Sequence, residues 1–143
     1  MYKLYAVGFG TGDRAHMTAE AESAILDADL VVGYTTYVRL MQPLFPEKEF
    51  FSTPMRKEID RCKLAIQEAR SGKTVAVISS GDSGIYGMAG VLLELAEAYD
   101  DLEVIVVPGI TASNAAAAVL GAPLMHDFAT ISLSDCMTPL ELI

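Results

Sequence analysis

Residues 74–87 read TVAVISSGDSGIYG and indicate the fold class. The first six residues form an apolar run, which is typical of a strand buried on both faces of a parallel sheet. The following residues are small, polar and rich in glycine, so they predict a turn. The apolar segment Met88–Tyr99 then predicts a helix. A strand, a turn and a helix in this order are the repeating unit of α/β proteins.

The segments before residue 74 continue this alternation. Strands are expected at Tyr2–Gly8, Leu30–Val32 and Glu49–Phe51, and helices at Thr18–Ala28, Tyr37–Met41 and Ile59–Ala69. Thr18 is the expected cap of its helix. In the third helix, residues 59, 62, 66 and 69 form an apolar face, and Arg61 is expected on the charged face with its acidic and basic neighbours.

Three further elements are expected after residue 100. Glu103–Val107 reads as a buried strand, Ala112–Leu120 as an alanine-rich helix, and Phe128–Leu133 as a last strand. The expected fold is therefore α/β, with a mostly parallel sheet and helices on both faces. We expect one α/β domain over residues 1–124, and over residues 125–143 the first strand and start of a second, truncated α/β domain.

Composition limits the classes of function. The chain has 143 residues, of which 52% are hydrophobic, and a formal net charge of −9. Nucleic-acid binding needs a basic surface, so this charge argues against it. No run of about 18 apolar residues and no signal-peptide pattern is present, so we expect no membrane span. Cys62 and Cys136 lack metal-ligand spacing, and we expect no metal and two free thiols in the cytoplasm.

The first glycine-rich loop, Gly8–Asp13, reads GFGTGD. It differs from the dinucleotide fingerprint G-x-G-x-x-G because Asp13 stands at the position of the last glycine. By itself the loop fits either a tight turn or a ligand-binding loop.

Two further loops follow predicted strands. Ser79–Gly87 differs from the hydrolase pattern G-x-S-x-G because Ile85 replaces the last glycine. Within it, Asp82 is expected either to accept hydrogen bonds from a ligand or to cap a helix. In Val107–Ser113, Thr111 is the expected cap of a helix whose first N–H groups can also bind a ligand.

Taken together, the three loops resemble those of the tetrapyrrole methylases. That family carries G-x-G-P-G-D, S-G-D and P-G-[IVT]-[ST] motifs, which are matched here by Gly8–Asp13, Ser80–Asp82 and Pro108–Thr111. Thr11 replaces the usual proline of the first motif. The segments Val32–Tyr37, Ser79–Gly90 and Gly121–Asp135 are similar to one subgroup, the precorrin-3B C17-methyltransferases.

The resemblance implies an enzyme of cobalamin biosynthesis. Members of the subgroup transfer a methyl group from S-adenosylmethionine to C17 of precorrin-3B or cobalt-factor III, with ring contraction, and leave S-adenosylhomocysteine. The implied partners are this tetrapyrrole and a second copy of the chain in a homodimer. The resemblance names no catalytic acid or base.

It also implies two groups of site residues. The implied cofactor contacts are Thr11, Ser80, Gly81, Asp82, Ile85, Thr111 and Ala112. The implied tetrapyrrole contacts are Asp13, Tyr34, Tyr86 and Met88. Because the substrate carries many carboxylates, Arg39, Arg56 and Lys57 are candidate cations, or else ordinary surface residues.

Three alternatives remain at this point. The chain could be part of another tetrapyrrole methylase or of a nicotinamide-dependent oxidoreductase. It could also be a truncated, non-catalytic half of a protein that only binds a cofactor or dimerises.

Overall fold

The structure, a computed structural model, describes residues 1–134 and 137–143. The chain forms two compact units, residues 1–111 and residues 112–143, which are described separately below. The thiol expected at Cys136 lies outside the described residues.

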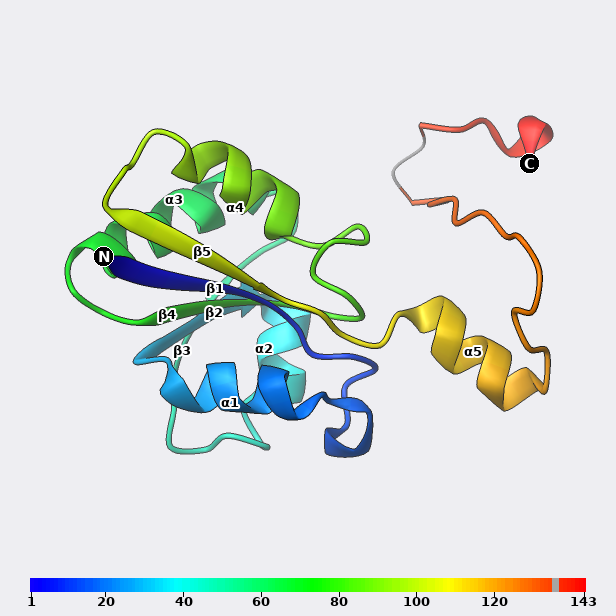
Figure 1. Ribbon diagram of the computed structural model, residues 1–143, viewed down its shortest axis with the longest axis horizontal. Helices are drawn as coiled ribbons and strands as arrows, with labels where there is room; N and C mark the ends of the chain where they lie inside the picture. The colour runs from blue at the N-terminus through cyan, green and yellow to red at the C-terminus, as the bar shows by residue number, and fades with distance from the viewer. Residues whose placement is uncertain (135–136) are drawn as a thin grey trace. The chain divides into compact units, whose positions relative to one another are not determined.

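The first unit is built on a five-stranded sheet in which all strands are parallel (Figure 1). The strand order across the sheet is β3-β2-β4-β1-β5. The strands are β1 (Tyr2–Gly8), β2 (Leu30–Tyr34), β3 (Glu49–Thr53), β4 (Val75–Ser79) and β5 (Leu102–Val107). All five strands predicted between residues 1 and 107 are therefore confirmed.

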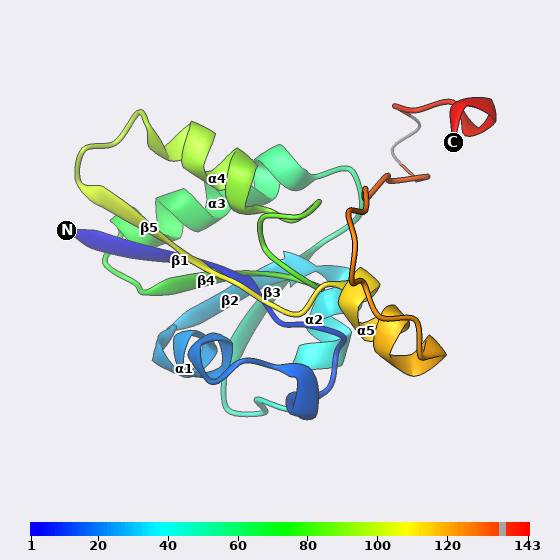
Figure 2. The ribbon, with the colours of Figure 1, turned by 45° about the vertical axis from the view of Figure 1, so that its right-hand side comes forward.

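Helices cover both faces of this sheet, as Figures 1 and 2 show. They are α1 (Ala19–Asp27), α2 (Thr35–Met41), α3 (Glu58–Arg70) and α4 (Ala89–Ala96), with a short 3-10 helix η1 (Arg14–His16) before α1. Buried residues of α1 and α2 pack in one core, and those of α3 and α4 in another. The predicted α/β fold with helices on both faces is confirmed.

The central strand β4 explains why two cores form. All five of its residues are buried. Val75 and Val77 belong to the core under α3 and α4, whereas Ala76 and Ile78 belong to the core under α1 and α2. Successive side chains of a strand point to opposite faces, so a continuous apolar run supplies both cores at once.

Helix α1 begins as the sequence predicts. The Thr18 side chain accepts a hydrogen bond from the N–H of Ala21 at 3.0 Å, which satisfies one of the donors that a helix N-terminus leaves unpaired.

Two predictions for the first unit need correction. Strand β5 lies at the edge of the sheet, so Glu103 and Val106 are exposed rather than buried. Helix α4 ends at Ala96, before the predicted end at Tyr99. The N–H of Tyr99 bonds to the carbonyl of Ala96 at 2.9 Å, and this tight turn leads the chain into β5.

The second unit contains helix α5 (Ala112–Leu120), as predicted, and a short 3-10 helix η2 (Leu140–Leu142). The strand predicted at Phe128–Leu133 is wrong, since residues 121–134 contain no strand. A strand needs a neighbour to pair its backbone groups, and the described part of this unit provides none. The expected domain boundary after residue 124 stays a prediction. No helix among the described residues is long and apolar enough to cross a membrane.

Candidate functional site

The order of the strands creates a topological switch point at the carboxyl ends of β1 and β4. These two strands are neighbours, but the chain after β1 leads to α1 on one face, whereas the chain after β4 leads to α4 on the other. Such a switch point is where open α/β sheets bind ligands. We call the loops after β1, β4 and β5 at this end of the sheet the carboxyl-edge loops.

The first two carboxyl-edge loops are hydrogen-bonded to each other. Gly10 and Gly81 exchange backbone bonds, with N···O distances of 3.0 and 2.7 Å. Both residues have positive φ angles, 75° and 66°, in a region that glycine adopts without steric penalty. Two motifs about 70 residues apart in the sequence therefore meet through their glycines.

The Asp82 carboxylate connects the second loop to the third. Its Oδ1 accepts a hydrogen bond from the N–H of Gly109 at 2.8 Å, and its Oδ2 accepts one from the N–H of Gly84 at 2.9 Å. Neither expected role of Asp82, a ligand contact or a helix cap, includes this link between two loops. The ligand contact stays a prediction. The observed role of its carboxylate is to hold two loops together.

Gly109 lies where all three loops meet. A Cβ at this position would lie 2.5 Å from the carbonyl oxygen of Gly8 and still closer to that of Gly81. Because both neighbours are backbone atoms, no side-chain movement would relieve the overlap. The glycine of the third motif is therefore required for packing.

Ser83 is a structural residue that the sequence analysis did not single out. It is fully buried, and its Oγ donates to the carbonyl of Val107 at 2.9 Å. This bond attaches the loop after β4 to the end of β5. A serine inside a glycine-rich loop gives no sequence signal for such a distant partner.

The predicted cofactor residues are only partly brought together. Ser80 and Ile85 are exposed on the same loop as Gly81 and Asp82. Thr11 is exposed on the first loop, with its Oγ1 2.9 Å from Nδ1 of His16. Thr111 is the last residue of the first unit, and Ala112 belongs to the second unit, so its role as a cofactor contact stays a prediction.

Asp13, a predicted substrate contact, has a local structural role. Its carboxylate caps η1 by accepting a hydrogen bond from the N–H of His16 at 2.8 Å. This backbone bond lowers the pKa of the Asp13 carboxyl, and the nearby His16 side chain lowers it further.

The other three predicted substrate residues line one cavity. Tyr34, Tyr86 and Met88 surround a space of about 190 Å³, together with Tyr37, Met55, Glu58, Arg61, Ser79, Gly87 and Val91. Tyr86 has a φ of 52° and is 65% exposed. A non-glycine residue in this backbone region is uncommon and is often found at functional sites.

Arg61 is the residue of this cavity that sequence reasoning placed wrongly. It was expected on the charged face of α3, but it is only 3% exposed. The sequence contains a signal for this burial. Arg61, Ala65 and Ala69 follow at four-residue spacing and so share one face of the helix, and the structure buries all three. The three cations weighed from the sequence, Arg39, Arg56 and Lys57, are instead exposed.

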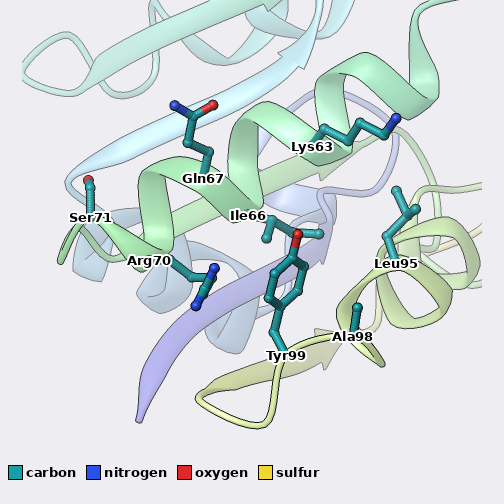
Figure 3. A pocket seen from close by; sticks show the side chains of 8 residues that line it. All are labelled: Lys63, Ile66, Gln67, Arg70, Ser71, Leu95, Ala98 and Tyr99. Atoms are coloured by element: carbon teal, nitrogen blue, oxygen red, sulfur yellow. The ribbon is translucent and has the colours of Figure 1, made fainter.

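A larger groove lies elsewhere, between α3 and the end of α4 (Figure 3). It has a volume of about 710 Å³ and is lined by Lys63, Ile66, Gln67, Arg70, Ser71, Leu95, Ala98 and Tyr99. Arg70 bonds to Asp101 at 3.1 Å and lies 4.4 Å from the centre of the Tyr99 ring. No predicted site residue lines this groove, and its arginine is already paired.

The charged residues of the described chain do not form a metal site. Residues 1–134 and 137–143 contain no group of three or more His, Cys, Asp or Glu side chains that could hold a metal ion.

A parallel α/β sheet with glycine-rich loops joined at a switch point is the class of fold that binds small molecules at its carboxyl edge. The family described as Tetrapyrrole (Corrin/Porphyrin) Methylases matches residues 3–142, and the chain belongs to it. The family predicted from the three loops is confirmed.

Individual relatives agree with this assignment. The chain is 52% identical to the "Probable cobalt-factor III C(17)-methyltransferase" of Salmonella typhimurium over 98% of this chain and 58% of that protein. It is 49% identical to the "Cobalt-factor III methyltransferase" of Priestia megaterium over 99% of this chain and 27% of that protein. The chain thus spans little more than half, or less, of these relatives.

A solved structure supports the same relationship. The crystal structure of the methyltransferase CobJ matches 99% of this chain and 59% of its own, with a TM-score of 0.85 and 40% identity.

Proposed function

We propose that the whole protein methylates C17 of cobalt-factor III or precorrin-3B, with ring contraction, in cobalamin biosynthesis. The observation that carries this proposal is the near-complete match of the chain to two relatives named for that substrate, at 49% and 52% identity. The matched segments include all three carboxyl-edge loops. Another relative, from Sinorhizobium, is named "Precorrin-3B C(17)-methyltransferase" and is 38% identical.

The residues of the carboxyl-edge loops fit S-adenosylmethionine better than a phosphorylated cofactor. Residues 8–13, 79–87 and 107–113 contain no lysine or arginine, but they do contain two aspartates. A pyrophosphate favours basic side chains as well as helix N-termini, whereas a cationic sulfonium does not need them. The exposed side chain of Ile85 offers an apolar surface for a nucleoside.

When bound, S-adenosylmethionine supplies an activated methyl group, so the protein mainly has to orient the two reactants. We propose that Gly81 and Ile85 contact the cofactor through their backbone, and that Thr11, Ser80 and Thr111 line the same site. A cofactor contact by Ala112, which belongs to the second unit, is proposed from the sequence alone. Asp82 is proposed as a polar contact of the cofactor, because each of its carboxylate oxygens accepts one backbone N–H and has a further lone pair for a ligand donor. The same two hydrogen bonds are proposed to fix the shape of the cofactor site.

The proposed substrate contacts are Tyr34, Tyr86 and Met88, because they line one cavity beside the carboxyl-edge loops. Asp13 remains a proposed contact in the loop after β1, where its capping bond from the N–H of His16 fixes the direction of its carboxylate. Aromatic side chains present flat apolar surfaces on which a macrocycle can stack.

Calorimetric titration of the chain with S-adenosylhomocysteine, with NAD as the control ligand, tests the class of cofactor. Micromolar binding of the first ligand and none of the second is expected. Binding of NAD alone would refute the methyltransferase proposal.

We also propose that the protein is a homodimer. Helix α5 has no buried residue, and Val119 and Leu120 are 88% and 78% exposed. Apolar surface of this kind favours association with another surface. Light scattering on the purified chain should give twice the monomer mass, and a monomer mass at micromolar concentration would refute this proposal.

A further inference from the structure

Arg61 is a buried cation that forms no ion pair within the described residues. Within residues 1–134 and 137–143, no Asp or Glu oxygen lies within 4.0 Å of its guanidinium nitrogens. Its 3% exposure also keeps most solvent away. A buried charge is normally paired, because a neutral environment stabilises it much less than water does.

Neutral groups hold the Arg61 side chain in place. Its Nε donates to Oγ1 of Thr53 at 2.7 Å, its Nη2 to the carbonyl of Pro54 at 3.3 Å, and its Nη1 to the sulfur of Met88 at 3.5 Å. Thr53 ends β3 and Pro54 follows it, so the guanidinium is fixed at the carboxyl end of the sheet.

These contacts leave part of the guanidinium available. An arginine has five N–H groups, and three of them are used in the described part of the chain. The remaining two belong to Nη1 and Nη2. One N–H on each terminal nitrogen is the arrangement that binds both oxygens of a carboxylate.

The cavity beside Arg61 has the size of a side chain rather than of a macrocycle. Its volume is about 190 Å³. Drug-sized ligands occupy cavities of about 300 Å³ or more. One acidic side chain of a large ligand fits here, while Tyr34 and Tyr86 at the same cavity can meet an apolar ring.

We infer that this cavity is a subsite for one carboxylate of the substrate, with Arg61 as the cation that binds it. The inference rests on the proposed function, because a tetrapyrrole with acidic side chains is the ligand that brings such a group. Arg61 then determines substrate specificity, because its guanidinium binds an acidic side chain of the substrate at one position beside the carboxyl-edge loops. Glu58 also lines the cavity, and its negative charge opposes the incoming carboxylate without pairing with Arg61.

The test uses the 143-residue chain and uroporphyrin III, a soluble tetrapyrrole with acetate and propionate side chains, in a fluorescence titration. Arg61→Met should weaken binding at least tenfold, and Arg61→Lys should weaken it less because it keeps the charge. Arg70→Met is the matched control on the same helix and should change affinity less than twofold. Glu58→Gln should bind equally well or more tightly.

Two results would overturn the inference. One is a folded Arg61→Met variant whose affinity for uroporphyrin III is within twofold of the unchanged chain. The other is no binding of uroporphyrin III by the unchanged chain. Separate titrations with S-adenosylhomocysteine test the proposed function, since failure there leaves the porphyrin result intact.

A second measurement is made on the unchanged chain, and only the assignment of the resonance uses a variant. In the unchanged chain, the Nε–H resonance of Arg61, assigned by its loss in Arg61→Lys, should shift when uroporphyrin III is added. The Nε–H resonance of Arg70 should not shift. Equal shifts of the two resonances, or none at Arg61, would contradict a specific subsite.

Discussion

Helix α3 carries one arginine towards each end of the sheet, and the two arginines have opposite surroundings. Arg70 lies near the amino ends of the strands, where it is partly exposed, bonds to Asp101 and stacks on Tyr99. Arg61 lies near the carboxyl ends, where it is buried among neutral partners beside a cavity. One end of the sheet has its charge balanced within the chain, and the other has a cation suited to a ligand.

The two ends of the sheet also differ in how closely the backbone packs. At the carboxyl edge, the carbonyl oxygens of Gly8 and Gly81 lie so close to Gly109 that they leave no room for a Cβ atom at position 109. At the amino end, Gly72 follows α3 and has open space around it. Close backbone packing is therefore a local property of the carboxyl edge.

The largest expected effect comes from Gly109→Ala. The added methyl group overlaps two backbone carbonyls, so we expect a loss of about 3 kcal/mol or more in the free energy of unfolding. Urea denaturation measures it. Gly90→Ala in α4 is the control, because nothing lies within 4 Å of its Cβ and alanine should stabilise the helix by about 0.5–1 kcal/mol. Equal stability of the two variants would contradict the close packing at position 109.

Removal of the Asp82 carboxylate should have the next largest effect. Asp82→Ala deletes two hydrogen bonds to a charged acceptor, and we expect a loss of about 2 kcal/mol in stability. We also expect more than tenfold weaker binding of S-adenosylhomocysteine in calorimetry. Asp82→Asn retains one acceptor oxygen, so its stability and its affinity should lie between those of the unchanged chain and those of Asp82→Ala. Unchanged affinity in Asp82→Ala would remove Asp82 from the proposed cofactor site.

Cys62, between the two arginines on α3, should make stability depend on pH. Burial raises the pKa of its thiol to about 11 from an ordinary value of 9.0, although the charge of Arg61 acts in the opposite direction. Above pH 9 the unfolded chain loses this proton while the folded chain keeps it. The stabilisation is therefore complete below pH 9 and is lost as the pH rises towards 11, on the order of 2 kcal/mol in total.

Urea denaturation at pH 8, 9 and 10 measures this effect. Cys62→Ala removes the titrating group, so the difference between the two chains isolates its contribution from those of tyrosines and lysines. A constant difference across this range would show that Cys62 does not titrate in this way.

The smallest effect is expected at the amino end. Arg70 and Asp101 are both more than 40% exposed, so solvent screens their attraction. Arg70→Met should lower the free energy of unfolding by only about 0.5 kcal/mol, and added salt should reduce the difference. If Arg70→Met lowered the free energy of unfolding as much as Asp82→Ala, the proposed difference between the two ends of the sheet would be wrong.

The sequence by itself predicted most of the fold and the loops that form the candidate site. Alternating apolar runs and helical patterns located all five strands of the sheet, because periodicity and turn residues act over short distances. A parallel sheet then places the loops after β1, β4 and β5 at one edge. The three motifs in those loops also indicated the family.

Tertiary structure decided what individual side chains do. Asp82 bonds to a backbone group 27 residues away, and Ser83 to one 24 residues away. Arg61 is buried because the end of β3 and Met88 enclose it. Phe128–Leu133, despite its apolar sequence, forms no strand, because the described part of its unit contains no pairing partner. Each of these outcomes depends on contacts between distant segments, which local periodicity does not encode.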